Sequence, residues 1–393
     1  MKTEVFISGA GPAGATLAIL LAKSGLSVVL ADPVPSLPLK QVKMGTRTSA
    51  VMQSWLPLLE ETGALAKIRE HTAPLEALSI IDAANPQFGK AERFDYAASE
   101  IGEKAFSLNI PNGYLRAALF EIAASTKNLT LITDSGFESA EQHANGITIT
   151  LENGQTIEAQ LLVGADGRKS KVRENAKLPV RSSEYGQSGI TCRLSHTKPH
   201  QNRSTEFHYK GGPFTLVPLP AKHSALVWLV KDEDSARLKH LGKDSFTQEI
   251  QTMSKGELGQ LTLEEGPEIC PIVALSAPAL TAPRTALIAE AAHVLSPIGA
   301  QGFNLSLADV AALKDLVIEA HHLGLDIGSD TLLKRYEKQR KPDLSLRQNA
   351  VDTLNRMVAS ESGLPQILRR AGLSGLSAIT PLRKKLMRAG YKA

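Results

Sequence analysis

The chain has 393 residues, is 42% hydrophobic and 21% charged, and carries a net charge of +4. This composition indicates a globular protein of two or three domains, with no run that approaches the ~20 apolar residues of a membrane-spanning helix. Two widely separated cysteines, Cys192 and Cys270, suit a reducing compartment and argue against zinc or iron–sulfur sites. We therefore expect buried thiols, no metal centre and, because Met1 leads straight into a strand, a cytoplasmic protein.

The first predicted elements form a βαβ unit. An apolar strand over 5–7 leads into a G-x-G-x-x-G loop, an apolar helix and a second strand over 28–30. In such a unit the glycines allow a tight turn, a close approach to a pyrophosphate and close helix packing, while the helix N-terminus attracts phosphate. An acid after the second strand is placed to bind a ribose. The sequence therefore predicts a dinucleotide site that contains Gly9, Gly11, Pro12, Ala13, Gly14 and Asp32.

Up to residue 160, some of the predicted elements belong to the sheet of the βαβ unit and others lie outside it. The hydrophobic pattern predicts helices over 51–59 and 110–122 and strands over 75–81, 93–97, 129–132, 147–151 and around 157. The strand over 129–132 is expected to be parallel, and Glu152-Asn153-Gly154 predicts a hairpin. In the loop before the first of these helices, Arg47 is a candidate phosphate or flavin contact, and a solvated loop arginine is the alternative.

The second informative stretch is a buried strand over 161–163 that runs into Gly164-Ala165-Asp166-Gly167 and a short helix. Such a turn either places Asp166 beside a cofactor hydroxyl or lets it cap the helix. From about residue 180 to 278 the periodicity changes to antiparallel strands, over 206–209, 214–219 and 225–230, with a helix over 244–253. A sheet of this kind is a natural wall for a substrate pocket.

The third informative stretch runs from Thr285 to Asn304. A strand feeds small residues, then a Pro/Gly loop and then the start of a helix through Leu313. Backbone N–H groups at a helix N-terminus stabilise negative charge, which is what the N1–C2=O edge of a reduced flavin develops. His293 invites a catalytic interpretation, but a packed, hydrogen-bonded histidine is favoured.

Together the three stretches resemble the class A flavoprotein monooxygenases. That family has an N-terminal G-x-G-x-x-G, a middle D-G motif and a late G-D-x-x-H-x-x-x-P-x-x-G-Q-G-x-N stretch. In the same order this chain has GAGPAG from Gly9, GADGRKSKVR from Gly164 and AEAAHVLSPIGAQGFN from Ala289. Within the family, YEKQRKPD from Tyr336 and DTLNR from Asp352 look most like the ubiquinone-biosynthesis hydroxylases.

The resemblance implies an α/β fold with a Rossmann-like, para-hydroxybenzoate-hydroxylase-like FAD-binding domain, an interleaved antiparallel-sheet substrate domain and a helical C-terminal tail. We expect a discontinuous FAD-binding domain over 1–72, 105–180 and 280–360. The substrate domain is expected over 73–104 and 181–279, and a basic helical segment over 361–393.

By resemblance, the dinucleotide residues together with Arg47 and Arg116 would hold the adenosine and pyrophosphate of FAD. Asp166 and Gly167 would line the cofactor and the nicotinamide approach. The flavin ring and ribityl chain would meet Pro297, Gly299, Gln301, Gly302 and Asn304. Of these, Pro297, Gly299 and Gln301 form the catalytic flavin-ring loop, with no acid or base assigned.

Two departures from the family pattern bear on FAD binding. Where relatives have Gly-Asp, this chain has Ala289-Glu290, so the longer Glu290 carboxylate must serve beside the phosphates. The flavin-ring loop reads Gly299-Ala300-Gln301-Gly302, in which a glycine is shifted relative to many relatives.

The resemblance implies an FAD-dependent monooxygenase that hydroxylates the ring of a polyprenylated phenol in ubiquinone biosynthesis. In the family NAD(P)H reduces FAD, O2 adds to give a C4a-hydroperoxide, and the protein orients the substrate and excludes water. The alternatives are a hydroxylase of a small soluble aromatic, a prenyl reductase or a halogenase, and a non-catalytic flavin-binding scaffold in a biosynthetic complex. The halogenase W-x-W-x-I-P run is absent from the sequence.

The tail over 361–393 has seven basic residues and one acid, which makes it +6 and leaves −2 for the rest. Its one aromatic residue is Tyr391, so nucleic acid is not expected as a partner. After Pro381, apolar residues alternate with basic ones in a pattern that suits an amphipathic helix on an anionic membrane surface. A solvated helix or a docking segment for other quinone-biosynthesis proteins is the alternative. The tail is thus the segment expected to hold the protein at the inner membrane face.

Overall fold

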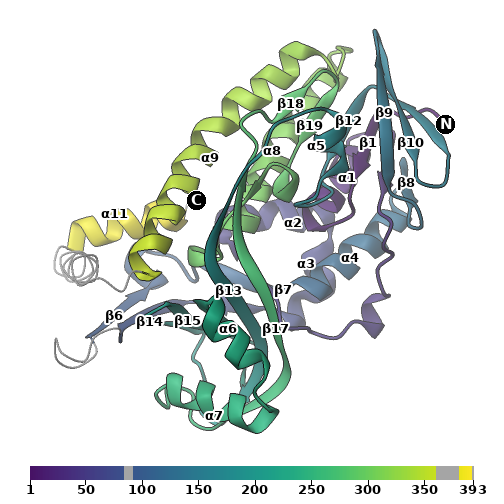
Figure 1. Cartoon of the computed structure of the whole chain (residues 1–393). Coiled ribbons are helices and arrows are strands. Elements are labelled where there is room, and N and C mark those ends of the chain that lie inside the picture. Colours follow the sequence, from purple (N-terminus) through teal and green to yellow (C-terminus); the bar gives the residue numbers. More distant parts are fainter. Residues whose placement is uncertain (84–91, 360–379, 392–393) are drawn as a thin grey trace.

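A parallel sheet of five strands forms the first layer of the fold, in the order β19-β12-β1-β2-β8, with β18 antiparallel at its edge. The computed structural model describes residues 1–83, 92–359 and 380–391 (Figure 1). The strands are β1 (Val5–Ser8), β2 (Val28–Ala31), β8 (Leu129–Ile132), β12 (Leu161–Gly164), β18 (Thr281–Ala282) and β19 (Thr285–Leu287). The predicted βαβ unit and the parallel strand over 129–132 are both confirmed.

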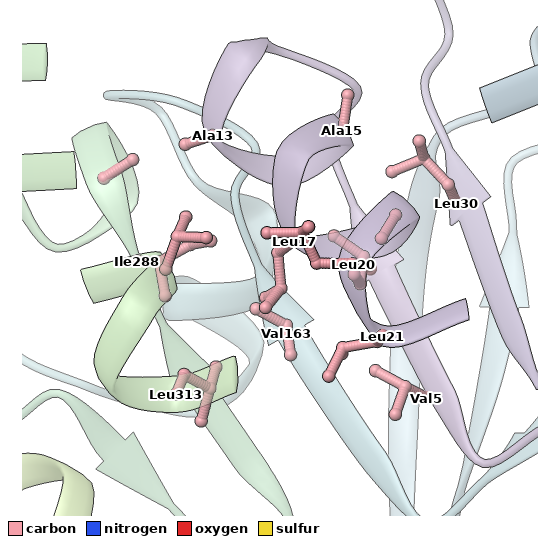
Figure 2. Close-up of a cluster of buried hydrophobic side chains, with 14 of the residues drawn as sticks. Val5, Ala13, Ala15, Leu17, Leu20, Leu21, Leu30, Val163, Ile288 and Leu313 are labelled. Atoms are coloured by element: carbon pink, nitrogen blue, oxygen red, sulfur yellow. The ribbon is translucent and has the colours of Figure 1, made fainter. Parts of the chain in front are cut away.

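Helices and a small sheet cover this parallel sheet. Helix α1 (Pro12–Lys23) packs against α4 (Asn112–Ser125) and α8 (Gln301–His322). In Figure 2 its leucines, such as Leu17, lie beside Val163 of β12. A three-stranded antiparallel sheet of β9 (Phe137–His143), β10 (Gly146–Leu151) and β11 (Thr156–Ala159) adds every second side chain of β10 to the same core.

An eight-stranded sheet forms the second layer, in the order β20-β17-β13-β16-β15-β14-β5-β6. Its strands are β5 (Ala77–Asp82), β6 (Glu92–Ala97), β13 (Arg181–His196), β14 (Arg203–Tyr209), β15 (Gly212–Leu219), β16 (His223–Lys231), β17 (Leu261–Ser276) and β20 (His293–Val294). Helices α6 (Asp232–Lys239) and α7 (Lys243–Met253) lie against it, and α7 matches the predicted helix. The expected antiparallel layer is confirmed, and the domain boundaries stay predictions.

The two long strands β13 and β17 run side by side from the second layer towards the first (Figure 1). The sequence pattern missed both of them. The first residues of β13, over 181–184, are exposed and only its second half is regularly buried, so no continuous alternation marks the strand.

The predicted helix over 51–59 is wrong in its first half. Residues Thr48–Met52 form β3, which pairs with β7 (Ser107–Pro111) in a sheet that also contains β4 (Ala73–Leu75). The helix, α2 (Leu56–Thr62), begins only after this strand. Pro57 lies in its first turn, where the missing N–H would have had no helical partner in any case.

The remaining helices surround these layers. They are α3 (Ala64–Ile68), α5 (Lys171–Asn175), the long α9 (Asp330–Ala359) and α11 (Thr380–Tyr391), and the short turn η5 (Ala98–Ile101) packs against α11. Figure 1 shows α9 along one side of the molecule and α11 near the end of α9 and β6. None of the described helices is both long enough and apolar enough to cross a bilayer.

A buried carboxylate joins α8 to α9 and to the turn after β19. Asp309 is fully buried and accepts hydrogen bonds from His293 Nε2 at 2.6 Å, Arg340 Nε at 2.7 Å and the Ala289 N–H at 3.0 Å. Burial opposes ionisation, but attraction to His293 and Arg340 holds the pKa of Asp309 below its ordinary value. His293 is therefore the packed, hydrogen-bonded residue that the sequence favoured.

Replacing this carboxylate is expected to be costly. Asp309→Asn leaves the Arg340 guanidinium buried without its full partner, so we expect the free energy of unfolding to fall by about 3 kcal/mol or more. Urea titration followed by circular dichroism measures the change. Asp315→Asn on the same helix is the control, because that side chain is 72% exposed; we expect it to change stability by less than about 0.5 kcal/mol.

The difference in stability between wild type and Asp309→Asn should also depend on pH. Because the folded-state pKa of Asp309 is depressed, its contribution is present above the unfolded-state pKa, near 4, and is lost as pH falls through the folded value. The stability gap between wild type and Asp309→Asn should thus narrow below about pH 4. A gap that is constant down to pH 2 would contradict an ionised Asp309.

Candidate active site

The three sequence stretches meet at the carboxyl edge of the parallel sheet. Strands β1, β12 and β19 are adjacent, so the turns that follow them lie side by side. The Ala165 N–H donates to Ser8 O at 2.8 Å and the Ile288 N–H to Gly164 O at 3.0 Å. Ligands of open α/β sheets bind at this edge.

The glycines of the first turn differ in what surrounds them. Gly9 has φ +103°, and a Cβ there would lie 2.3 Å from Ala165 O; a Cβ on Gly14 would lie 2.0 Å from Gly9 O. These two glycines are required by close backbone packing within the protein. A Cβ on Gly11 would meet nothing within 4 Å, so Gly11 borders open space at the start of α1.

Asp32 ends β2 beside this turn. Its carboxylate accepts from the Ala10 N–H at 2.7 Å and from the Val34 N–H at 2.8 Å. Arg116 donates to Val34 O at 2.6 Å and lies 3.8 Å from the Asp32 carboxylate. Asp32 and Arg116 are therefore neighbours, as the prediction of a shared role requires, and the carboxylate oxygens keep lone pairs for a further donor.

Asp166 has one paired and one unpaired oxygen. Its Oδ2 accepts from the Val172 N–H at 3.1 Å, whereas Oδ1 is buried with no hydrogen-bond partner. Burial raises the pKa of Asp166. The cap of α5 is Ser170, which accepts from the Arg173 N–H. Asp166 thus reaches the helix end with one oxygen and leaves the other for a ligand donor, beside Gly167 with φ +83°.

The departure at 289–290 is accommodated with strain. Ala289 has φ +56°, a left-handed conformation that costs a non-glycine residue about 1–2 kcal/mol. Its N–H is fixed by Asp309. The Glu290 side chain is 62% exposed and lies 3.9 Å from Arg168 Nε. The longer carboxylate thus extends to the outside of the turn, towards the arginine that follows Gly167.

The flavin-ring loop is held from two sides. Gly299 and Ala300 have φ +71° and +54°, so the chain reverses into the start of α8. Asn304 is buried, accepts from the Met52 N–H at 2.9 Å, and donates to Ala50 O and Ala300 O at 2.8 and 2.7 Å. Its amide therefore fastens the loop to β3.

From the other side, α9 reaches Gln301 through a row of charged groups. Arg347 donates to Gln301 Oε1 at 2.9 Å and to Asp343 at 2.6 Å, and Asp343 accepts from Arg340 at 2.9 Å. Arg340 binds Asp309 in turn. Sequence reasoning used the residues around Arg340 only as a family signature, and their contact with the loop could not be deduced from spacing.

The Arg47 side chain lies against β17. Its guanidinium contacts Cys270 Sγ at 2.5 Å and lies 3.6 Å from Glu268, both on β17. A role at the phosphates stays a prediction. The expectation of two buried thiols is wrong for Cys270, which is partly exposed, and right for Cys192, where burial raises the pKa of the thiol to about 12.

A cavity of about 640 Å³ separates the flavin-ring loop from the eight-stranded sheet. Its walls come from β3–β7, the loop over 297–303, one face of β14–β16 and α11. Most lining groups are apolar, among them Leu78, Ile80, Val217, Val227, Leu229 and Phe303. This size suits an organic ligand, and the sheet that was expected to form the wall of a pocket does line this cavity; that the ligand is the substrate stays a prediction.

Apart from Gln301, the polar groups in this cavity were not found from the sequence. They include Glu206 on β14 and Asn109 on β7, whose buried Oδ1 has no partner. The alternation Ser204, Glu206, His208 along β14 is the signal that could have found Glu206, because it puts three polar side chains on one face.

These observations fit FAD. Gly11 leaves room for a phosphate at a helix N-terminus, Asp166 Oδ1 is an orphaned acceptor for a hydroxyl, and Asp32 has spare lone pairs. The three lie on one edge of one sheet.

Comparison with known proteins identifies the family of the chain. Residues 2–347 match the model of the FAD binding domain family. The chain is 31% identical to ubiquinone hydroxylase UbiL of Rhodospirillum rubrum, over 98% of this chain and 88% of the relative. It is 28% identical to ubiquinone hydroxylase UbiM of Neisseria meningitidis, over 98% and 83%. Among solved structures, p-nitrophenol 4-monooxygenase PnpA of Pseudomonas putida superposes with a TM-score of 0.80 at 14% identity, over 99% and 97%. The chain belongs to the FAD binding domain family and is an FAD-dependent monooxygenase of class A.

Proposed function

We propose that this protein hydroxylates the aromatic ring of a polyprenylated phenol in ubiquinone biosynthesis, with NAD(P)H and O2 as co-substrates. The observation that carries the proposal is the apolar cavity between the flavin-ring loop and the sheet. The names of the full-length relatives, ubiquinone hydroxylases, support this substrate class.

In this proposal FAD lies along the carboxyl edge of the parallel sheet. Gly11, Pro12 and Ala13 at the start of α1 would hold its pyrophosphate, and Asp32, with Arg116 beside it, would bind its ribose. Asp166 Oδ1 accepts from a cofactor hydroxyl. The flavin ring meets the loop that contains Pro297, Gly299, Gln301 and Gly302, at one end of the cavity. When bound, FAD supplies the transfer of electrons from NAD(P)H to O2 and of one oxygen atom to the ring.

The chain's own contribution is orientation and exclusion of water. The cavity walls hold the ring against the flavin-ring loop, while the row from Asp309 to Arg347 fixes Gln301 at that loop. Apolar walls also keep water from the reacting oxygen, which would otherwise leave as peroxide. A small soluble aromatic is the second candidate substrate, but the mainly apolar lining favours a substrate that carries an apolar chain.

The cofactor site predicts opposite results for two neighbouring glycines. Gly11→Ala adds a methyl to open space, so the unfolding free energy of the apoprotein should stay within about 0.5 kcal/mol of wild type while the Kd for FAD rises at least tenfold. Gly14→Ala forces a clash with the Gly9 carbonyl and should destabilise the apoprotein by about 2 kcal/mol or more. Urea titration and FAD titration monitored by fluorescence measure both quantities. Unchanged FAD affinity in Gly11→Ala would place the phosphates elsewhere.

The activity is tested with FAD-loaded protein, a short-chain prenylphenol, NADH or NADPH, and ¹⁸O2. We expect one labelled oxygen in the ring, measured by mass spectrometry, and faster flavin bleaching under nitrogen when the phenol is present. Bleaching without labelled product in air would favour a reductase. Protein that binds FAD but is not reduced with any phenol would favour the scaffold alternative.

We further propose that α11 brings the protein to an anionic membrane surface, where a prenylated substrate resides. Lys385 and Arg388 are exposed on this helix, whereas Arg383 and Met387 line the cavity. Docking on a partner protein is the alternative.

Reversing the two exposed charges, Lys385→Glu with Arg388→Glu, tests the membrane proposal. Each basic residue near such a surface contributes about 1 kcal/mol, and reversal adds repulsion, so binding to vesicles with 30% phosphatidylserine should fall roughly 30-fold or more. Vesicle co-sedimentation measures it, with FAD content as the control for folding. Equal binding by wild type and variant, or by neutral and anionic vesicles, would exclude this surface.

A further inference from the structure

Glu206 is the one carboxylate among the described residues that line the cavity. It lies on β14, on the same face as Ser204 and His208, opposite Thr215 of β15. The surrounding wall is mainly aliphatic. An ionised group in such surroundings is costly unless hydrogen bonds satisfy it, so its presence needs an explanation.

Two neighbours keep Glu206 ionised. His208 Nε2 lies 2.7 Å from Oε1, and Thr215 donates to Oε2 at 3.3 Å. Burial raises the pKa of the Glu206 carboxyl, and the hydrogen bond from His208 opposes that effect because it favours the ionised form. A carboxylate has about four lone-pair sites, so these two partners leave capacity for a donor from the cavity.

The charge of Glu206 is not cancelled by its histidine partner. His208 is 95% buried, and its Nδ1 has no hydrogen-bond partner. A neutral ring with its hydrogen on Nε2 accounts for this, because a protonated ring would leave a buried Nδ1–H donor unsatisfied. The cation that lines the cavity, Arg383, is paired with Glu100. The cavity wall therefore presents a negative acceptor.

We propose that Glu206 accepts a hydrogen bond from the ring hydroxyl of the substrate, and so selects a phenol and fixes the orientation of its ring. This inference rests on the proposed function, and it names a group that recognises the substrate. Such a hydrogen bond to a charged acceptor is stronger than one between neutral groups. It also pushes electron density towards the ring carbons ortho and para to the hydroxyl, which are the carbons that an electrophilic oxygen attacks.

Glu206 holds the phenol hydrogen by hydrogen bonding and does not remove it in the resting complex. A phenol has a pKa of about 10 and a glutamate one of about 4.3, so complete transfer is unfavourable by a factor of roughly 10⁵. The hydrogen therefore stays on the phenol oxygen. The contribution of Glu206 is recognition and polarisation.

The test compares 2-prenylphenol with its methyl ether, 2-prenylanisole, on FAD-loaded full-length protein by isothermal titration calorimetry. The two ligands differ in one donor hydrogen. Wild type should bind the phenol roughly 10- to 100-fold more tightly than the ether, since a hydrogen bond to a charged group contributes that much to affinity. In Glu206→Gln the preference should fall below about threefold, because a neutral amide replaces the charged acceptor.

Glu265→Gln is the matched control. It makes the same carboxylate-to-amide change on β17, where Glu265 pairs with Arg193 at 3.4 Å outside the cavity lining, and it should keep the full preference. Circular dichroism and bound FAD verify folding of both variants. The comparison of the phenol with the ether on wild-type protein needs neither variant.

Equal affinity of wild type for the phenol and the ether overturns the role of Glu206, as does a preference that survives Glu206→Gln. In both cases labelled oxygen in the product would still uphold the proposed function. A wild type that binds neither ligand and hydroxylates no phenol overturns the proposed substrate class, and the role of Glu206 with it.

Discussion

The carboxylate of Asp309 is the constraint on which the geometry of the site depends. It lies on α8 and accepts hydrogen bonds from the turn at Ala289, from His293 and from Arg340 of α9. Removing it from water is unfavourable, and its three donors offset that cost together. Because Arg340 continues through Asp343 and Arg347 to Gln301, the same buried charge connects the third turn of the dinucleotide edge with the flavin-ring loop. This network thereby fixes the position of the cavity relative to the sheet edge at which the cofactor is expected.

The parts of the site that the sequence predicted are those encoded in consecutive residues. The turn at Gly9, the turn at Asp166 and the loop at Pro297 each follow an apolar strand and precede a helix, so local spacing specifies them. The turns after β1, β12 and β19 meet at one sheet edge because these parallel strands are adjacent, and the loop at Pro297 follows between β20 and α8. Even here local pattern had a limit, because Val51 and Met52, which the pattern assigned to a helix, end β3 and pair with β7.

The cavity could not be predicted, since its walls come from segments that are distant in the chain and whose local patterns are ordinary. Glu206 is one polar residue in an alternating strand, and only the packing of that strand opposite the flavin-ring loop gives it a role. Asn304 shows the converse. Its position in the motif implies a contact with the flavin, while its amide is engaged by Ala50, Met52 and Ala300. In this structure the hydrogen bonds of Asn304 hold β3 against the loop.

In the membrane proposal, helix α11 connects the cavity with the delivery of substrate. Helix α11 contributes Arg383 and Met387 to the cavity and keeps Lys385 and Arg388 exposed, so a surface bound by those cations would lie next to the cavity wall. Each CH2 group exposed to water costs about 0.8 kcal/mol, which amounts to roughly 4 kcal/mol for a five-carbon prenyl unit. A cavity of about 640 Å³ holds a ring and a short part of a long chain. On the proposed function and the proposed membrane role of α11, the rest of the prenyl chain stays in lipid during the reaction, and a wall formed by α11 would let the ring enter without that exposure.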